Sequence, residues 1–234
     1  MATSVNPRAA ERTAGSAGRP RRRGVARAVA GQEARLEALR ERREIEHQEL
    51  LAAALRAFVA RGYADTRVED VLREAGISTR AFYRFHAGKD ELFLELFARA
   101  NDAAMARLGD VVSRQKSPPA RLDAYIDATL DLAYEPRYRR ETKLFSSVPA
   151  ELRERYSSEV RACQEQLVGL LVEIVTAGRA SGDFPKVEPA EDAWALHGVL
   201  AGTLTRVLSA DEPPPRDRLS RHLRRFCRAA LARG

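Results

Sequence analysis

The chain of 234 residues has only two cysteines and no long apolar run. Cys163 and Cys227 lie far apart, without a CxxC pair or a neighbouring histidine, which argues against a zinc site and against a disulfide framework. No stretch approaches the roughly 18 apolar residues of a transmembrane helix, and no apolar segment follows the basic N-terminus as in a secretory signal. These absences favour a soluble protein of the reducing cytoplasm, with no membrane partner and two small core cysteines.

Catalytic motifs are also missing. The sequence has no GxGxxG after a strand, no GKS or GKT phosphate loop, no HExxH, and no Ser or Cys in a recognisable nucleophile setting. It also lacks the alternating hydrophobicity of strands, whereas apolar residues recur at helical spacing in most segments. We therefore expect an all-α protein of about nine helices that is not an enzyme and needs no cofactor or metal.

Positive charge is concentrated at the N-terminus. Residues 1–43 contain eleven Arg and four Glu, so the whole net charge of +7 lies there. Because this segment has almost no apolar bulk, we expect a disordered basic arm from Met1 to about Gly31, followed by a helical leader from Gln32. Arg19, Arg21, Arg22 and Arg23 resemble the Gly-Arg-Pro core of an AT-hook, an extended arm that enters the minor groove of A·T-rich DNA. General attraction to phosphates is the alternative.

The segment from Thr66 to Lys89 predicts two short helices joined by a tight turn. Thr66 and Glu69 have the spacing of a capping box, and Gly76 is placed to end the first helix in a left-handed conformation. Ser78 is a suitable N-cap for the second helix, where Ile77 can pack on Phe82. This pattern is a helix-turn-helix.

The second helix carries hydrogen-bond donors around the apolar Phe82. In a major groove, Arg80 could contact guanine bidentately and Thr79 could contact a thymine methyl or a base edge. Lys89 opens the next helix although a cation there opposes the helix dipole, and a DNA phosphate would relieve this conflict.

Residues Leu50 to Phe97 resemble the DNA-binding domain of the TetR family of bacterial transcriptional regulators. The resemblance rests on Gly62-Tyr63, Ala75-Gly76-Ile77-Ser78, Phe82-Tyr83 and Lys89-Asp90-Glu91-Leu92. It implies that Thr79 and Arg80 face bases, and that Tyr83 and Lys89 face phosphates. Phe85 precedes His86, whereas the family often has the reverse order. The side chains expected at the DNA are Thr66, Ser78, Thr79, Arg80, Tyr83, Arg84, His86 and Lys89.

The remaining sequence predicts a C-terminal helical domain for ligand binding and dimerisation. We expect the arm and leader at 1–43, the DNA-binding domain at 44–100 and the C-terminal domain at 101–234. The predicted helices cover about 90–114, 120–133, 136–147, 149–181, 188–209 and 216–233, with breaks at proline or glycine.

The last two predicted helices are amphipathic, and the first of them has Gly198 and Gly202 one turn apart. Two such helices from each of two subunits would form a four-helix bundle, as the resemblance also implies. Packing within one subunit is the alternative. The expected dimer residues are Leu196, Gly198, Gly202, Leu219, Leu223 and Phe226. Arg224, Arg225 and Arg228 are interpreted as a solvated face.

A small-molecule effector would bind among the middle helices. Aromatic or polar residues on otherwise apolar faces are the candidates, although such residues are more often ordinary packing: Tyr125, Thr129, Phe145, Trp194 and His197. We thus expect a homodimeric repressor that binds a palindromic site in double-stranded DNA and is released by a ligand. The alternative is a helical small-molecule-binding or adaptor protein with weak or non-specific DNA binding, favoured by the excess of acidic over basic residues in 44–104.

Overall fold

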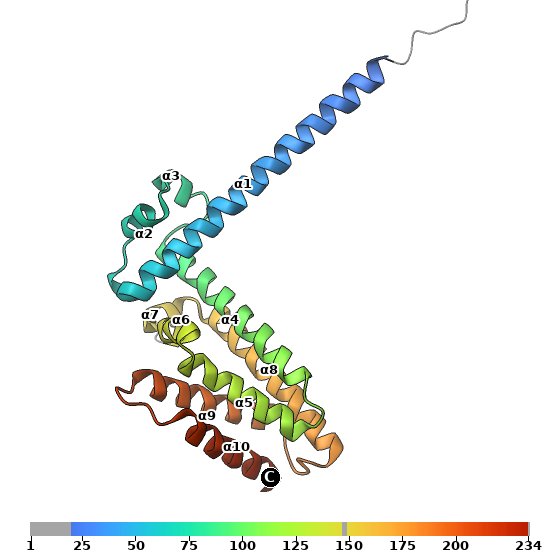
Figure 1. The fold of residues 1–234 in the computed structure, drawn as a ribbon, viewed down its shortest axis with the longest axis vertical. Coiled ribbons are helices and arrows are strands. Elements are labelled where there is room, and N and C mark those ends of the chain that lie inside the picture. Colours follow the sequence, from blue (N-terminus) through green and yellow to red (C-terminus); the bar gives the residue numbers. More distant parts are fainter. Residues whose placement is uncertain (1–19, 147–148, 234) are drawn as a thin grey trace, which may run out of the picture. The chain divides into compact units, whose positions relative to one another are not determined.

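The computed structural model describes residues 20–146 and 149–233, with side-chain surroundings from residue 31 to residue 232. It divides into two units, Met1–Gln48 and Glu49–Gly234, which are described separately. Ten helices and no strand occur in the described residues, so the all-α prediction is confirmed (Figure 1). No helix within these ranges is long and apolar enough to cross a membrane.

The described part of the first unit is helical. Helix α1 (Pro20–Asp65) begins in it, about twelve residues before the leader that we expected from Gln32. The prediction of disorder is therefore wrong for residues 20–31. Proline is tolerated in the first turn of a helix, and the alanines and arginines that follow are good helix formers.

The AT-hook expectation falls largely on this helix. Arg21, Arg22 and Arg23 belong to α1, so their backbone is helical rather than extended. Arg19 lies outside the described residues. Farther along the first unit, Leu36, Leu39 and Ile45 are exposed, which agrees with a charged helix that buries no core of its own.

The second unit continues α1 and adds the remaining nine helices of the described residues. Their bounds are α2 (Val68–Ala75), α3 (Thr79–Phe82), α4 (Lys89–Ser113), α5 (Pro118–Tyr134), α6 (Pro136–Ser146), α7 (Ala150–Arg155), α8 (Ser157–Ser181), α9 (Pro189–Ser209) and α10 (Arg216–Arg233). Helix α4 packs on α5 and α8, while α5 also contacts α9 and α10 (Figure 1). The extra helix relative to the prediction comes from a break at Tyr156, where φ is −119° and ψ is 40°. The apolar spacing missed this break because it runs on across it.

One hydrophobic cluster holds the helix-turn-helix together, and we call it the aromatic cluster. Phe58, Phe82 and Phe93 are fully buried at its centre, and the rings of Phe58 and Phe93 meet edge to face at 5.4 Å. The cluster also includes Phe145 of α6 and Leu152 of α7. The cluster thus contains residues of α2 and α3 together with residues of two helices from later in the chain.

The second cluster, which we call the aliphatic cluster, lies among α4, α5, α8, α9 and α10. Leu196, Leu219 and Leu223 belong to it and are at most 6 % exposed within one subunit. Their assignment to a dimer interface is therefore wrong. Helical periodicity identifies an apolar face but does not say whether the same chain or another one covers it.

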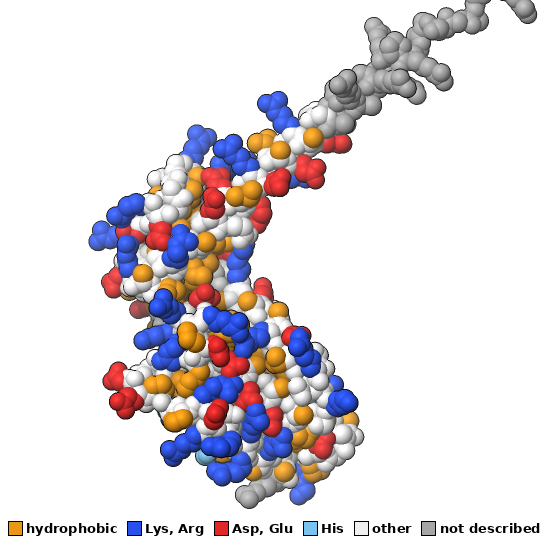
Figure 2. All heavy atoms as spheres, viewed as in Figure 1, with side chains coloured by type: hydrophobic (Ala, Val, Ile, Leu, Met, Phe, Trp, Pro, Cys, Tyr) orange, Lys and Arg blue, Asp and Glu red, His pale blue; other side chains and the backbone are white. Residues whose placement is uncertain are grey.

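Ion pairs join α5 to α10 at the surface of this cluster. Asp123 accepts two hydrogen bonds from Arg228, at 2.8 and 2.6 Å, and Asp127 pairs with Arg224. Arg224 and Arg228 are thus paired side chains rather than a purely solvated face. On the side shown in Figure 2, acidic and basic side chains are interspersed over the C-terminal helices.

Candidate DNA-binding surface and internal cavity

The start of α2 differs from the predicted capping box. Arg67 is the N-cap residue, and its N–H donates to the Asp70 carboxylate at 3.1 Å. Thr66 is fully buried, and its hydroxyl donates to the carbonyl oxygens of Gly62 at 2.7 Å and Ala57 at 3.3 Å. The expectation that Thr66 contacts DNA is therefore wrong, because its side chain stabilises the end of α1.

The turn between α2 and α3 follows the prediction. Gly76 has φ of 66°, which is a left-handed conformation that L side chains rarely adopt. The Ser78 hydroxyl accepts a hydrogen bond from Ala81 N–H at 3.2 Å, so the N-cap is confirmed. These two residues fix where α3 begins and therefore which of its side chains face outward.

Helix α3 exposes polar side chains around one buried apolar residue. Phe82 is fully buried in the aromatic cluster, whereas Thr79, Arg80 and Arg84 are exposed and Tyr83 is 57 % exposed. The tyrosine ring meets Phe82 edge to face at 5.2 Å, which orients it. A helical turn anchored by one buried ring and bearing a guanidinium and a hydroxyl at its start is suited to reading base edges.

Lys89 has partners within the protein. Its ammonium group donates to the carbonyl oxygen of Tyr63 at 2.9 Å and lies 4.2 Å from the centre of the Tyr63 ring. The carbonyl at the end of α1 and the aromatic ring relieve the conflict with the α4 dipole, so no phosphate is needed for that purpose. A phosphate contact by Lys89 stays a prediction.

His86 lies inside the protein rather than at its surface. It is 2 % exposed, and its Nε2 lies 2.7 Å from the Glu95 carboxylate on α4. The prediction of a direct DNA contact by His86 is therefore wrong. The side chain instead packs near Phe82 and connects the residues that follow α3 to α4.

A polar chain connects the end of α1, the start of α4 and α7. The Tyr63 hydroxyl donates to Asp90, which also accepts from Arg155 at 2.8 Å. Burial and the Asp90 hydrogen bond raise the pKa of Tyr63, so the phenol stays a donor at physiological pH. Together with the aromatic cluster, this chain ties the DNA-reading segment to the C-terminal helices.

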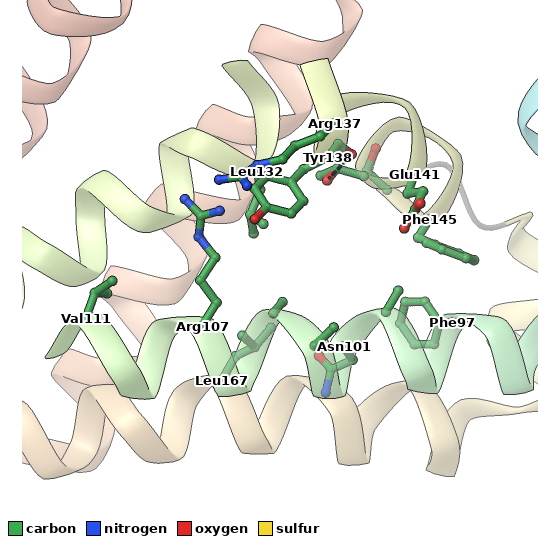
Figure 3. Close-up of a pocket in the computed structure, with 15 residues that line it drawn as sticks. Phe97, Asn101, Arg107, Val111, Leu132, Arg137, Tyr138, Glu141, Phe145 and Leu167 are labelled. Atoms are coloured by element: carbon green, nitrogen blue, oxygen red, sulfur yellow. Dashed lines mark hydrogen bonds between the residues drawn. The ribbon is translucent and has the colours of Figure 1, made fainter. Parts of the chain in front are cut away.

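A cavity of about 710 Å³ lies in the second unit between α4 and α6, with contributions from α5 and α8 (Figure 3). Its apolar part includes Phe97, Phe145 and Leu167, and its polar part includes Arg107 and Arg137. This volume is within the range of pockets that hold drug-sized molecules. The cavity is therefore a candidate ligand site.

Of the five residues predicted for this site, Phe145 lines the cavity and the other four do not. Tyr125 is buried in the aliphatic cluster, where its hydroxyl donates to Leu167 O at 3.3 Å and burial raises its pKa. Thr129 is also buried. Trp194 is 39 % exposed, and its ring meets the His197 ring edge to face with 5.9 Å between their centres. Those four assignments are wrong, because an aromatic or polar residue on an apolar face is equally compatible with core or surface packing.

The residues that sequence reasoning missed come mainly from α4 and the first part of α6. Arg107 and Tyr138 are the main examples, and the Arg107 guanidinium lies 4.4 Å from the centre of the Tyr138 ring. A basic residue on the same helical face as Ala100, Ala103 and Ala104 was the available signal, since small side chains leave room beside a helix.

Two family models match the chain. Residues 50–96 match the model described as bacterial regulatory proteins of the tetR family, and residues 118–232 match the C-terminal part of BetI-type transcriptional repressors. The chain belongs to the TetR family. It is therefore a DNA-binding transcriptional regulator, as the sequence predicted.

Individual relatives agree with this membership. A Mycobacterium tuberculosis protein named as the transcriptional regulator MftR is 27 % identical over 147 residues, covering 62 % of this chain and 71 % of the relative. FadR of Bacillus subtilis, solved with stearoyl-CoA, aligns with a TM-score of 0.66 at 17 % identity over 77 % of this chain and 97 % of its own. FadR of Bacillus halodurans aligns with a TM-score of 0.65 at 16 % identity, with coverages of 78 % and 97 %. These two structural alignments show that this chain shares the fold of the two FadR structures.

Proposed function

We propose that this TetR-family protein is a cytoplasmic homodimeric repressor that leaves a palindromic operator when a small molecule fills the cavity between α4 and α6. The observation that carries the proposal is the presentation of Arg80 and Thr79 on a capped turn whose Phe82 is locked in the aromatic cluster. Arg80 would read a guanine and Thr79 a neighbouring base, while Tyr83, Arg84 and Lys89 would contact phosphates.

Dimerisation is supported by the exposed face of α9 and α10. Trp194 is 39 % exposed and Phe226 is 50 % exposed, and the space beside Gly198 and Gly202 is open. Large exposed rings beside small residues are typical of a surface that another helix covers. Two copies joined here would place two reading turns on successive major grooves, roughly 34 to 36 Å apart.

The cavity supports ligand control because its wall is shared with the aromatic cluster. Phe145 lines the cavity, and its ring lies 5.4 Å from Phe93 and 5.8 Å from Phe97. A ligand that shifts Phe145 would act on the ring of Phe93, which belongs with Phe82 of α3 to the aromatic cluster. Release then requires that the ligand prefer the subunit arrangement that cannot span both half-sites. The stearoyl-CoA complex of the B. subtilis relative supports a ligand-responsive role.

The domain arrangement forms part of the proposal. Residues 44–100 would bind DNA, 101–234 would bind the ligand and the second subunit, and the basic arm and leader at 1–43 would add affinity through phosphates.

The decisive experiment selects genomic fragments with the purified full chain and then measures fluorescence anisotropy at fixed salt. Arg80→Ala should weaken operator binding by about 1 to 3 kcal/mol and relax preference at one position of each half-site. Arg114→Ala is the matched control, since Arg114 is the exposed C-cap arginine that follows α4 and pairs with Asp110. Equal losses on operator and random DNA would contradict the role of Arg80. Absence of DNA binding by the wild type would favour the adaptor alternative.

A further inference from the structure

The cavity between α4 and α6 has an unequal distribution of charge. Arg107 and Arg137 line it together with one acidic residue, Glu141. Figure 3 shows the two guanidinium groups near Tyr138, with Glu141 displaced along α6 toward Phe145. The cavity therefore has a basic end and an end formed by aromatic rings.

Tyr138 holds both arginines in place. The Arg107 guanidinium lies 4.4 Å from the centre of its ring, and the Arg137 guanidinium lies 4.5 Å from it. Two like charges on one ring repel each other, which an anion between or beside them would relieve. Arg137 forms no ion pair with a residue in the described ranges, so its charge is available.

Arg107 is partly satisfied by the protein. Its Nη2 donates to Asp131 at 2.8 Å, but Asp131 also accepts from Arg216 of α10 at 2.8 Å, so one carboxylate is shared by two guanidinium groups. The Nε of Arg107 is buried and has no hydrogen-bond partner among the described residues. A buried donor without an acceptor is costly, and turning the Arg107 side chain toward a ligand oxygen in the cavity would remove that cost.

Glu141, the acidic residue of the lining, lies toward the aromatic end of the cavity (Figure 3). Burial raises the pKa of Glu141, and the rings of Phe97 and Phe145 also line the cavity. An apolar group is therefore the better occupant of that end.

Building on the proposed function, we propose that the cavity binds a molecule with an apolar body and one anionic group, the anion accepting hydrogen bonds from Arg107 and lying beside Arg137. The apolar body contacts Phe97 and Phe145, so the same ligand reaches the ring shared with the aromatic cluster. Because Arg107 shares Asp131 with Arg216, anion binding also changes the pairing at the first residue of α10.

The test compares two fluorescent probes that share an apolar body, one of which bears an anionic group. 8-Anilino-1-naphthalenesulfonate carries a sulfonate, and N-phenyl-1-naphthylamine is its neutral counterpart. The full wild-type chain should bind the sulfonate more tightly. Arg107→Met should weaken sulfonate binding about tenfold or more and leave the neutral probe unchanged, because a charge-assisted hydrogen bond is lost.

Three further variants keep the test decisive. Arg137→Gln changes an exposed side chain without an ion pair, so it should fold normally and weaken sulfonate binding several-fold. Glu141→Gln should leave sulfonate binding unchanged or tighten it. Arg114→Met, at the C-cap of the helix that carries Arg107 and outside the cavity, should have no effect.

Equal sulfonate affinities in wild type, Arg107→Met and Arg137→Gln would overturn the proposal. It would also be overturned if Glu141→Gln lost sulfonate binding and the wild type bound the cation decylamine more tightly than the anion decanoate. Because the probes are measured without DNA, these outcomes leave the proposed DNA binding untouched. Failure of the proposed function would instead appear as normal probe binding with no operator or no release from it.

Discussion

In the helix-turn-helix, the side chains proposed to read bases come from adjacent positions, Thr79 and Arg80, behind a cap and a turn formed by Gly76 and Ser78. In the cavity, neighbouring side chains come from α4, α5, α6 and α8, and Phe97 and Leu167 are seventy positions apart. The first surface is created by local backbone geometry, and the second by how helices pack. Mutations should therefore affect the two regions through different mechanisms.

The largest expected effect concerns close packing in the C-terminal region. A Cβ at Gly178 would overlap the buried ring of Phe184. The backbone N–H of Phe184 also donates a hydrogen bond to the Gly178 carbonyl oxygen at 3.0 Å. Gly178→Ala should lower the free energy of unfolding by about 1 to 3 kcal/mol. Gly169, on the same helix, has open space around it, so Gly169→Ala should raise it by about 0.5 to 1 kcal/mol. Urea unfolding measures both, and equal effects would mean that α8 does not approach Phe184 this closely.

A smaller effect distinguishes two buried threonines, one at the start of the helix-turn-helix and one on α5 outside the cavity. Thr66 donates to two carbonyl oxygens, whereas the Thr129 hydroxyl has no hydrogen-bond partner among the described residues. Thr66→Val should cost about 1 kcal/mol, and Thr129→Val should be neutral or slightly stabilising. Operator affinity should be unchanged in Thr66→Val. A selective loss of DNA binding in that variant would restore the contact that the structure argues against.

The smallest effect concerns pH. Burial lowers the pKa of His197, so in the unfolded chain this imidazole takes up a proton at a higher pH than in the folded chain. The contribution of His197 is therefore present above its unfolded pKa of about 6.5 and is lost as the pH falls through that value. His197→Gln should reduce the decline in unfolding free energy between pH 7.5 and 5.5. His222→Gln, at an exposed histidine of α10, is the control, and an equal change in it would remove His197 as the cause.

The difference between the regions also explains what the sequence could predict. The turn at Gly76, the cap at Ser78 and the end of α8 at Gly182 depend on a few neighbouring residues, and each was predicted correctly. The start of α2 was missed by one position because Thr66 and Arg67 can each precede a carboxylate at the spacing of a cap. Burial of Thr66 and His86 depends on how these side chains pack against α1 and α4, which the spacing of caps and turns does not specify.

The buried leucines, the ion pairs between α5 and α10, and the cavity all depend on long-range packing between helices. Leu196, Leu219 and Leu223 have the spacing of an interface, but α5 and α8 already cover that face. Asp123 and Asp127 are one turn apart, as are Arg224 and Arg228, and this matched spacing was the available signal that α5 pairs with α10. The cavity had no comparable signal, because its shape depends on the space that α4 and α6 leave between them.

The two cysteines give the chain a practical property. Cys227 is fully buried, and burial raises the pKa of its thiol to about 11, whereas Cys163 on α8 is partly exposed. A thiol reagent therefore has one accessible attachment point in the natural sequence. Cys163 lines the same hollow as Asp90 and Phe97 of α4, so a dye placed there faces the helix that follows the helix-turn-helix, without any mutation being introduced.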